Sequence, residues 1–155
     1  MAAPETDRVA VALGSNLGDR HAHLDYAVSR LRTLLSGLRI SRYYETIPVG
    51  TTGPQPLFLN AAAVGSTALD ARTLLSSLLA IESERGRSRQ VPNAPRTLDL
   101  DLVLYGDVVI AEPSLAVPHP RFRERRFVLE PLAEIAPDLV DPVTRLRIVE
   151  LLNQL

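Results

Sequence analysis

Six apolar segments of two different periods follow one another along the chain, and their order constrains the fold more than any other feature. The strand-like segments are short runs rich in apolar or β-branched residues, whereas the helix-like segments repeat leucine and alanine at three- and four-residue spacing. Gly14, Gly37, Asp70 and Gly86 separate them as turn and capping residues. The segments predict strands at residues 8–13, 40–46, 58–64 and 98–105, and helices at residues 24–35 and 70–85.

This order matches the ferredoxin-like α+β plan β-α-β-β-α-β, in which the helices cover one face of an antiparallel sheet. A C-terminal extension should follow. Gly106 and Asp107 predict a hairpin turn with a return strand at 108–110, and residues 144–152 predict a last amphipathic helix. No linker or repeat interrupts the 155 residues, so we expect a single domain over residues 1–155.

Composition excludes several classes of protein. The chain has no cysteine, which rules out disulfides and thiolate metal sites, and its net charge of −1 argues against general nucleic-acid binding. Apolar runs such as residues 102–105 fall far short of the roughly 18 residues of a membrane helix. The N-terminus lacks the pattern of a signal peptide. We therefore expect a cytoplasmic protein that contacts neither nucleic acid nor a membrane, and no obligate protein partner is evident.

Two aspartates form the strongest local signal. In the predicted strand at 98–105, Leu98, Leu100 and Leu102 share one face, so Asp99 and Asp101 share the other, with Cβ atoms about 7 Å apart. Two carboxylates that close repel each other unless a cation lies between them, and Mg²⁺ typically combines one or two carboxylates with phosphate oxygens. The alternative is a solvated acid pair facing arginine partners.

Arginines precede this pair in a loop at residues 87–97. Arg87, Arg89 and Arg96 could bind phosphate bidentately and close over a nucleotide, or could form an ordinary solvated basic loop. The chain has no lysine, so a P-loop is absent. His119, held between two prolines, is a further candidate for phosphate contact or acid catalysis, although a lone histidine is more often structural.

A polar residue interrupts the apolar strand at 58–64. The amide of Asn60 both donates and accepts, which matches the edge of a heterocycle, and Phe58 on the same face offers a stacking surface. The alternative is an asparagine that satisfies backbone groups beside a core phenylalanine. The turn at residues 14–19 is a candidate phosphate-binding loop, although ordinary turns have the same composition.

Together these segments resemble 6-hydroxymethyl-7,8-dihydropterin pyrophosphokinase, a family of the folate pathway. The resemblance covers nearly the whole chain in order, and its most specific part is Pro95-Arg96-Thr97-Leu98-Asp99-Leu100-Asp101. It rests on residues 11–19, 44–50, 55–61, 81–82, 86–89, 94–101, 117–121 and 125–129.

The resemblance implies Mg²⁺-dependent transfer of pyrophosphate from ATP to the pterin's hydroxymethyl oxygen, giving AMP. Asp99 and Asp101 match the ligands of two Mg²⁺ ions, and Arg87 and Arg96 match catalytic arginines that close over the phosphates. Further matches are to ATP-binding positions at Glu82, Leu102, His119 and Arg125, and to pterin-binding positions at Thr46, Val49, Phe58, Asn60 and Phe127. Asn93 stands where many members carry tryptophan, and Pro120 where others carry tyrosine.

Two other functions fit parts of the pattern. A Mg²⁺-dependent kinase acting on another small alcohol would release ADP instead of AMP. A catalytically silent ferredoxin-like module would bind nucleotide or pterin without turnover. The Asp99 and Asp101 pair, together with Arg87 and Arg96, disfavours the silent module, because a pure sensor has little use for two metal-holding carboxylates.

Overall fold

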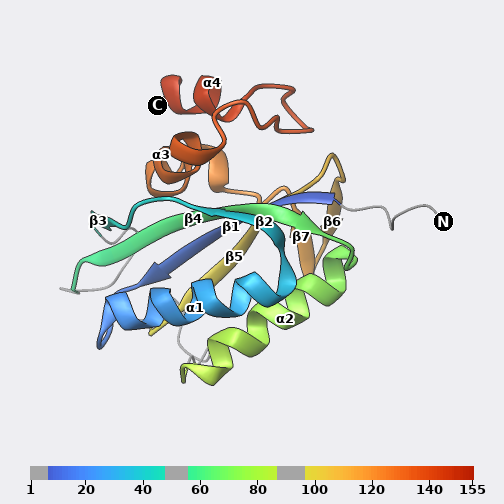
Figure 1. The fold of residues 1–155 in the computed structure, drawn as a ribbon. Helices are drawn as coiled ribbons and strands as arrows, with labels where there is room; N and C mark the ends of the chain where they lie inside the picture. The colour runs from blue at the N-terminus through green and yellow to red at the C-terminus, as the bar shows by residue number, and fades with distance from the viewer. Residues whose placement is uncertain (1–6, 48–55, 87–96) are drawn as a thin grey trace.

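The structure is a computed structural model and describes residues 7–47, 56–86 and 97–155 (Figure 1). Its elements follow in the order β1 (Asp7–Ser15), α1 (Arg20–Leu34), β2 (Ser36–Ile40), β3 (Tyr44–Thr46), β4 (Phe58–Thr67), α2 (Ala71–Glu84), β5 (Asp99–Tyr105), β6 (Ile110–Glu112), β7 (Leu115–Val117), the 3₁₀ turn η1 (Phe122–Glu124), α3 (Arg126–Ile135) and α4 (Ile148–Asn153). Within these described ranges, no helix is long and apolar enough to cross a membrane.

The main sheet confirms the ferredoxin-like plan. Its strand order is β2-β4-β1-β5, with β3 also paired to β4, and the pairs β1–β4, β1–β5, β2–β4 and β3–β4 are all antiparallel. Helices α1 and α2 both lie on one side of this sheet (Figure 1). We call the side covered by α1 and α2 the inner face, and the opposite side the outer face.

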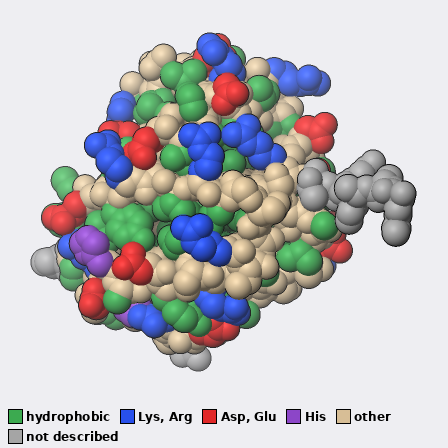
Figure 2. Space-filling view, viewed as in Figure 1, with side chains coloured by type: hydrophobic (Ala, Val, Ile, Leu, Met, Phe, Trp, Pro, Cys, Tyr) green, Lys and Arg blue, Asp and Glu red, His purple; other side chains and the backbone are tan. Residues whose placement is uncertain are grey.

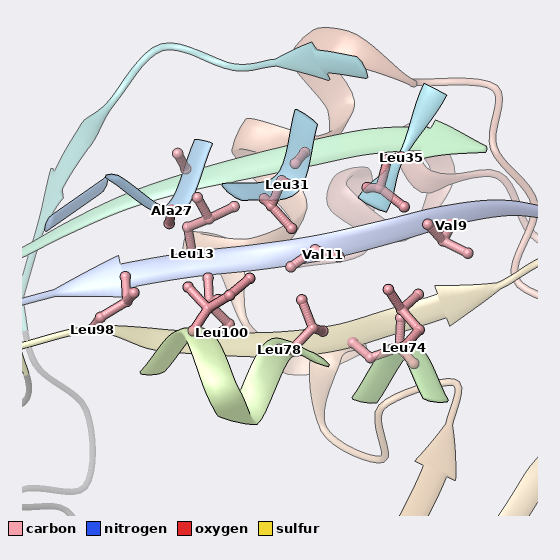
Figure 3. Packing of buried hydrophobic residues seen from close by; sticks show 14 of the residues in the cluster. Val9, Val11, Leu13, Ala27, Leu31, Leu35, Leu74, Leu78, Leu98 and Leu100 are labelled. Atoms are coloured by element: carbon pink, nitrogen blue, oxygen red, sulfur yellow. The ribbon is translucent and has the colours of Figure 1, made fainter. Parts of the chain in front are cut away.

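Leucine-rich packing fills the space between the inner face and the two helices. Figure 3 shows side chains of β1 and β5 meeting those of α1 and α2 in this layer. Both helices are capped at their N-termini, since the Asp19 carboxylate accepts from the Ala22 N–H and the carboxylate of Asp70, the predicted cap, accepts from the Thr73 N–H. The fully buried members include Val9, Leu13, Leu24, Leu31, Leu74, Leu78, Leu98 and Leu100.

The expected role of Gly37 is wrong. Helix α1 ends at Leu34, Leu35 is already extended, and Gly37 lies within β2 with a φ of 61°. The chain therefore passes from helix to strand without the left-handed glycine cap that the sequence suggested.

The expected single strand at 40–46 is also wrong, because it is two strands, β2 and β3, separated by residues 41–43. Pairing with β4 explains the break. Ile40 is opposite Ala63, and Tyr44 is opposite Asn60. An advance of four residues along the segment from β2 to β3 therefore matches an advance of three residues along β4. One extra residue is accommodated in a β-bulge, a feature that no hydrophobic pattern reveals.

The C-terminal extension covers the outer face, and its details differ from expectation. Helix α3 lies against this face and α4 packs on α3 (Figure 1). Small strand residues such as Ala10 and Ala62 share this second core with Phe122 and Leu129. Helix α3 was not predicted, because it contains Pro131 and proline usually interrupts a helix. The expected helix at 144–152 begins later, at Ile148. The turn after β5 is present, but the return strand instead forms a separate hairpin of β6 and β7.

A buried ion pair holds the extension together. Asp141 is fully buried and accepts hydrogen bonds from Arg123 (Nε at 2.5 Å and Nη2 at 3.0 Å), the Thr144 hydroxyl and the Val143 N–H. Burial alone would raise the pKa of Asp141, but these hydrogen bonds hold it below its usual value. By contrast, Figure 2 shows many acidic and basic side chains interspersed at the surface. Arg72 and Glu112 form one exposed ion pair.

Replacing Asp141 should be strongly destabilising. Asp141→Ala leaves the partly buried Arg123 guanidinium, the Thr144 hydroxyl and the Val143 N–H without their acceptor. We therefore expect the free energy of unfolding to fall by ~3 kcal/mol, measured by urea denaturation. Glu112→Ala, which breaks the exposed pair with Arg72, should cost at most about 0.5 kcal/mol. Equal losses in the two variants would contradict the structural role given to Asp141.

Candidate active site

The outer face of β5 carries the two aspartates as predicted. Leu98, Leu100 and Leu102 are buried in the inner core, whereas Asp99 and Asp101 are only half-buried. Asp99 lies opposite Gly14 of β1, and Asp101 lies opposite Ala12. Because Ala12 packs in the outer core, both carboxylates project from the outer face.

Asn60 projects from the same face, in the same row of paired residues. Tyr44, Asn60, Gly14 and Asp99 are successive partners across β3, β4, β1 and β5, and directly paired residues share a face. Asn60 is buried, and its side-chain oxygen accepts a hydrogen bond from the Thr46 hydroxyl. This bond fixes the orientation of the amide and leaves its NH₂ group as donor on the other side.

Gly14 makes this row possible, and its role was missed in the sequence. A Cβ at Gly14 would lie 3.0 Å from Asn60 Nδ2 and 3.5 Å from Phe58 Cδ1. A side chain at this position would press on both groups, so the glycine lets Asn60 and Phe58 lie close against β1 beside Asp99. The available signal was a glycine at the end of an apolar strand, which often marks close approach of a neighbouring group.

The two candidate aromatic residues come from different layers. Phe58 pairs with Thr46 and is therefore on the outer face beside Asn60. Phe127 lies in the first turn of α3, the helix that covers this face, and packs partly against the outer core. The Arg125 guanidinium carbon is 5.6 Å from the centre of the Phe127 ring.

His119 is held beside β5 in a defined protonation state. The backbone N–H of His119 donates to the Val103 carbonyl at 2.8 Å, and its ring Nδ1 accepts from the backbone N–H of Arg121 at 3.1 Å. Burial lowers the pKa of His119 to about 4, assisted by Arg125 and Arg121 and opposed by Asp99. At neutral pH the ring is therefore uncharged with its proton on Nε2, which makes Nε2 a hydrogen-bond donor.

Glu82 and Leu102 do not project from the outer face with the other candidates. Glu82 is buried in α2, and its carboxylate accepts from the Leu100 N–H of β5 at 2.7 Å. Leu102 has its side chain in the inner core. Their roles as nucleotide contacts stay predictions, and for Leu102 the contact would come from the backbone. Arg87, Arg96 and Val49 lie outside the described residues.

The donor set suits Mg²⁺ better than a metal held by protein alone. Among the described residues, no group of three or more histidines, cysteines or acids converges as a metal cage. Asp99 and Asp101 instead offer two hard oxygen groups on one strand face. Mg²⁺ prefers such oxygens and usually keeps water or substrate phosphates as its remaining ligands.

Comparison with known proteins gives a consistent result. A family model described as 7,8-dihydro-6-hydroxymethylpterin-pyrophosphokinase (HPPK) matches residues 10–137. The 2-amino-4-hydroxy-6-hydroxymethyldihydropteridine pyrophosphokinase of Synechocystis is 42% identical over 147 residues, covering 93% of this chain and 74% of that protein. The protein of the same name from Bacillus subtilis is 44% identical over 136 residues, covering 86% of this chain and 81% of that protein.

Some relatives are much longer. The folic acid synthesis protein fol1 of Pneumocystis carinii is 41% identical, but this chain covers only 20% of it. Wild-type HPPK-DHPS of Plasmodium falciparum matches in structure with a TM-score of 0.75 at 16% identity, covering 97% of this chain and 45% of that one. At that identity the structural match supports the fold alone.

The neutral state of His119 predicts a pH dependence of stability. The unfolded chain takes up a proton near the ordinary pKa of 6.5, and the folded chain only near 4, so the free energy of unfolding should fall as the pH drops between these values. Urea denaturation of the wild type and His119→Gln should show a smaller fall in the variant. Identical slopes in the wild type and His119→Gln would refute the assignment.

Proposed function

The chain belongs to the 7,8-dihydro-6-hydroxymethylpterin-pyrophosphokinase family and is therefore a diphosphate-transferring enzyme of folate biosynthesis, and we propose that ATP is its donor and Mg²⁺ its cofactor. One observation carries the assignment of the site. Asp99 and Asp101, which suit metal and phosphate, and Asn60, which suits a heterocycle, project from one sheet face on either side of Gly14.

On the phosphate side, Asp99 and Asp101 would hold two Mg²⁺ ions, which neutralise triphosphate charge when bound. His119 donates its Nε2–H to an oxygen of the nucleotide without adding charge, and Arg125 supplies a cation beside it. Glu82 in α2 and the backbone of Leu102 in β5 contribute further contacts to the nucleotide. Arg87 and Arg96 act on the transferring group as arginine clamps.

On the pterin side, the Asn60 amide hydrogen-bonds the edge of the ring, with its orientation set by Thr46. Phe58 and Phe127 stack on the two faces of the ring. The backbone near Val49 completes the pocket. Pterin selection then depends on an amide that is locked in one orientation before the substrate arrives, which reduces the ordering cost of binding.

The reaction needs positioning and charge stabilisation, without a covalent intermediate on the protein. The pterin's hydroxymethyl oxygen bonds to the β-phosphorus of ATP, the bond from that phosphorus to the α,β-bridging oxygen breaks, and AMP leaves as the hydroxyl proton is released. The protein holds the two substrates at adjacent positions of one sheet face and surrounds the phosphates with arginine and histidine donors.

Product analysis tests this function directly. Purified protein with ATP, Mg²⁺ and 6-hydroxymethyl-7,8-dihydropterin should give AMP and a diphosphorylated pterin, and no AMP when the pterin is left out. ADP would indicate an ordinary kinase on this scaffold. Binding without any turnover would indicate a silent module.

Asp101→Ala should abolish most of the activity. Losing one of two metal-holding carboxylates weakens the stabilisation of transition-state charge, so we expect kcat to fall about a thousandfold or more. Asp107→Ala, an exposed acid just beyond β5, is the matched control and should retain wild-type turnover. Near-normal turnover in Asp101→Ala at saturating Mg²⁺ would exclude the metal assignment.

A further inference from the structure

The bulge between β2 and β3 determines which side chains face the candidate pterin pocket. Ile40 packs in the inner core. In an uninterrupted strand, Tyr44 and Thr46 would alternate onto the same inner face as Ile40. The extra residue reverses this alternation, so that Tyr44 is opposite Asn60 and Thr46 is opposite Phe58 on the outer face. Without the bulge, Thr46 could not bond to Asn60.

Two side chains stabilise the bulge. The Ser41 hydroxyl takes the place of a strand carbonyl, because it accepts from the Ala62 N–H at 2.9 Å and donates to the Arg42 carbonyl at 2.7 Å. From above the outer face, the Glu134 carboxylate accepts from the Arg42 N–H at 2.9 Å, from Arg42 Nε at 3.1 Å and from the Tyr44 hydroxyl. Each residue satisfies an N–H that the irregular backbone would otherwise leave without a strand partner.

Glu134 remains ionised in this position. Partial burial would raise its pKa, but the hydrogen bonds from Tyr44 and from the Arg42 backbone and side chain hold it below its usual value. The Arg42 guanidinium also lies 4.9 Å from the centre of the Tyr44 ring. The carboxylate is therefore a charged acceptor for three donors.

The position of Glu134 links two walls of the proposed pocket. Glu134 is in the last turn of α3, whose first turn carries Phe127. Its partners, Arg42 and Tyr44, lie four and two residues before Thr46, and Tyr44 begins β3. Resting on the proposed function, we propose that Glu134 is a positioning residue that sets pterin affinity without touching the pterin, by fixing β3 against α3.

Kinetics of two variants test this role. Glu134→Ala and Tyr44→Phe should each raise the KM for the pterin about fivefold, the effect of losing roughly one hydrogen bond, while the KM for ATP stays within about twofold. In a Thr46→Val background, either change should add little, because its effect acts through Thr46. A general loss of structure would instead change the kinetic constants for both substrates and lower the melting temperature together.

The chain offers a closely matched control. Glu84 of α2 also accepts from a tyrosine hydroxyl, that of Tyr26, and from Arg30 Nε and Nη2, at 3.0 and 3.2 Å. Its side chain is 38% exposed, compared with 29% for Glu134. Glu84→Ala removes the same chemistry from the α1–α2 side and should leave the KM for the pterin unchanged. An equal rise in Glu84→Ala would overturn the proposal.

Amide hydrogen exchange separates this inference from the proposed function. Glu134→Ala should speed exchange at the β3 amides of the ligand-free protein, whereas Glu84→Ala should not. If the wild type forms no pterin-dependent AMP, the proposed function is wrong. Amide exchange at β3 would then be the only test of whether Glu134 fixes β3 against α3. Unchanged β3 exchange, or an unchanged KM for the pterin in an active Glu134→Ala variant, overturns it.

Discussion

The difference in side-chain size between the two faces of β1 is the constraint on which the rest of the structure depends. Large residues on its inner face fill the layer beneath α1 and α2, and small residues on its outer face allow α3 to approach. At the end of the strand this series reaches a glycine, which lets the Asn60 and Phe58 side chains lie close against β1. The two sets are Val9, Val11 and Leu13, and Ala10, Ala12 and Gly14.

Features that arise from local patterns could be predicted from the sequence. The alternation of Leu98, Leu100 and Leu102 with two aspartates determines which face each side chain takes, because strand geometry alone fixes it. The Asp70 cap was recognisable for the same reason, since its hydrogen bond spans three residues. The element order then gave the ferredoxin-like plan without further information.

Features that depend on distant partners could not be predicted. The bulge at residues 41–43 requires knowledge of the pairing with β4 and of Glu134, which lies 92 residues from Arg42. Helix α3 forms despite Pro131 because its apolar side chains are buried on the outer face, a tertiary effect that outweighs local propensity. The neutral ring of His119 likewise results from burial, which the sequence does not show.

The contact between Glu82 and β5 also bears on how copies of this protein behave in solution. Within the described sheet β5 pairs with no strand other than β1, and end strands of this kind are where sheets can join into aggregates. Glu82 occupies the Leu100 N–H of β5 with a buried carboxylate. A strand from another molecule would have to displace this charge, so Glu82 also discourages intermolecular sheet growth.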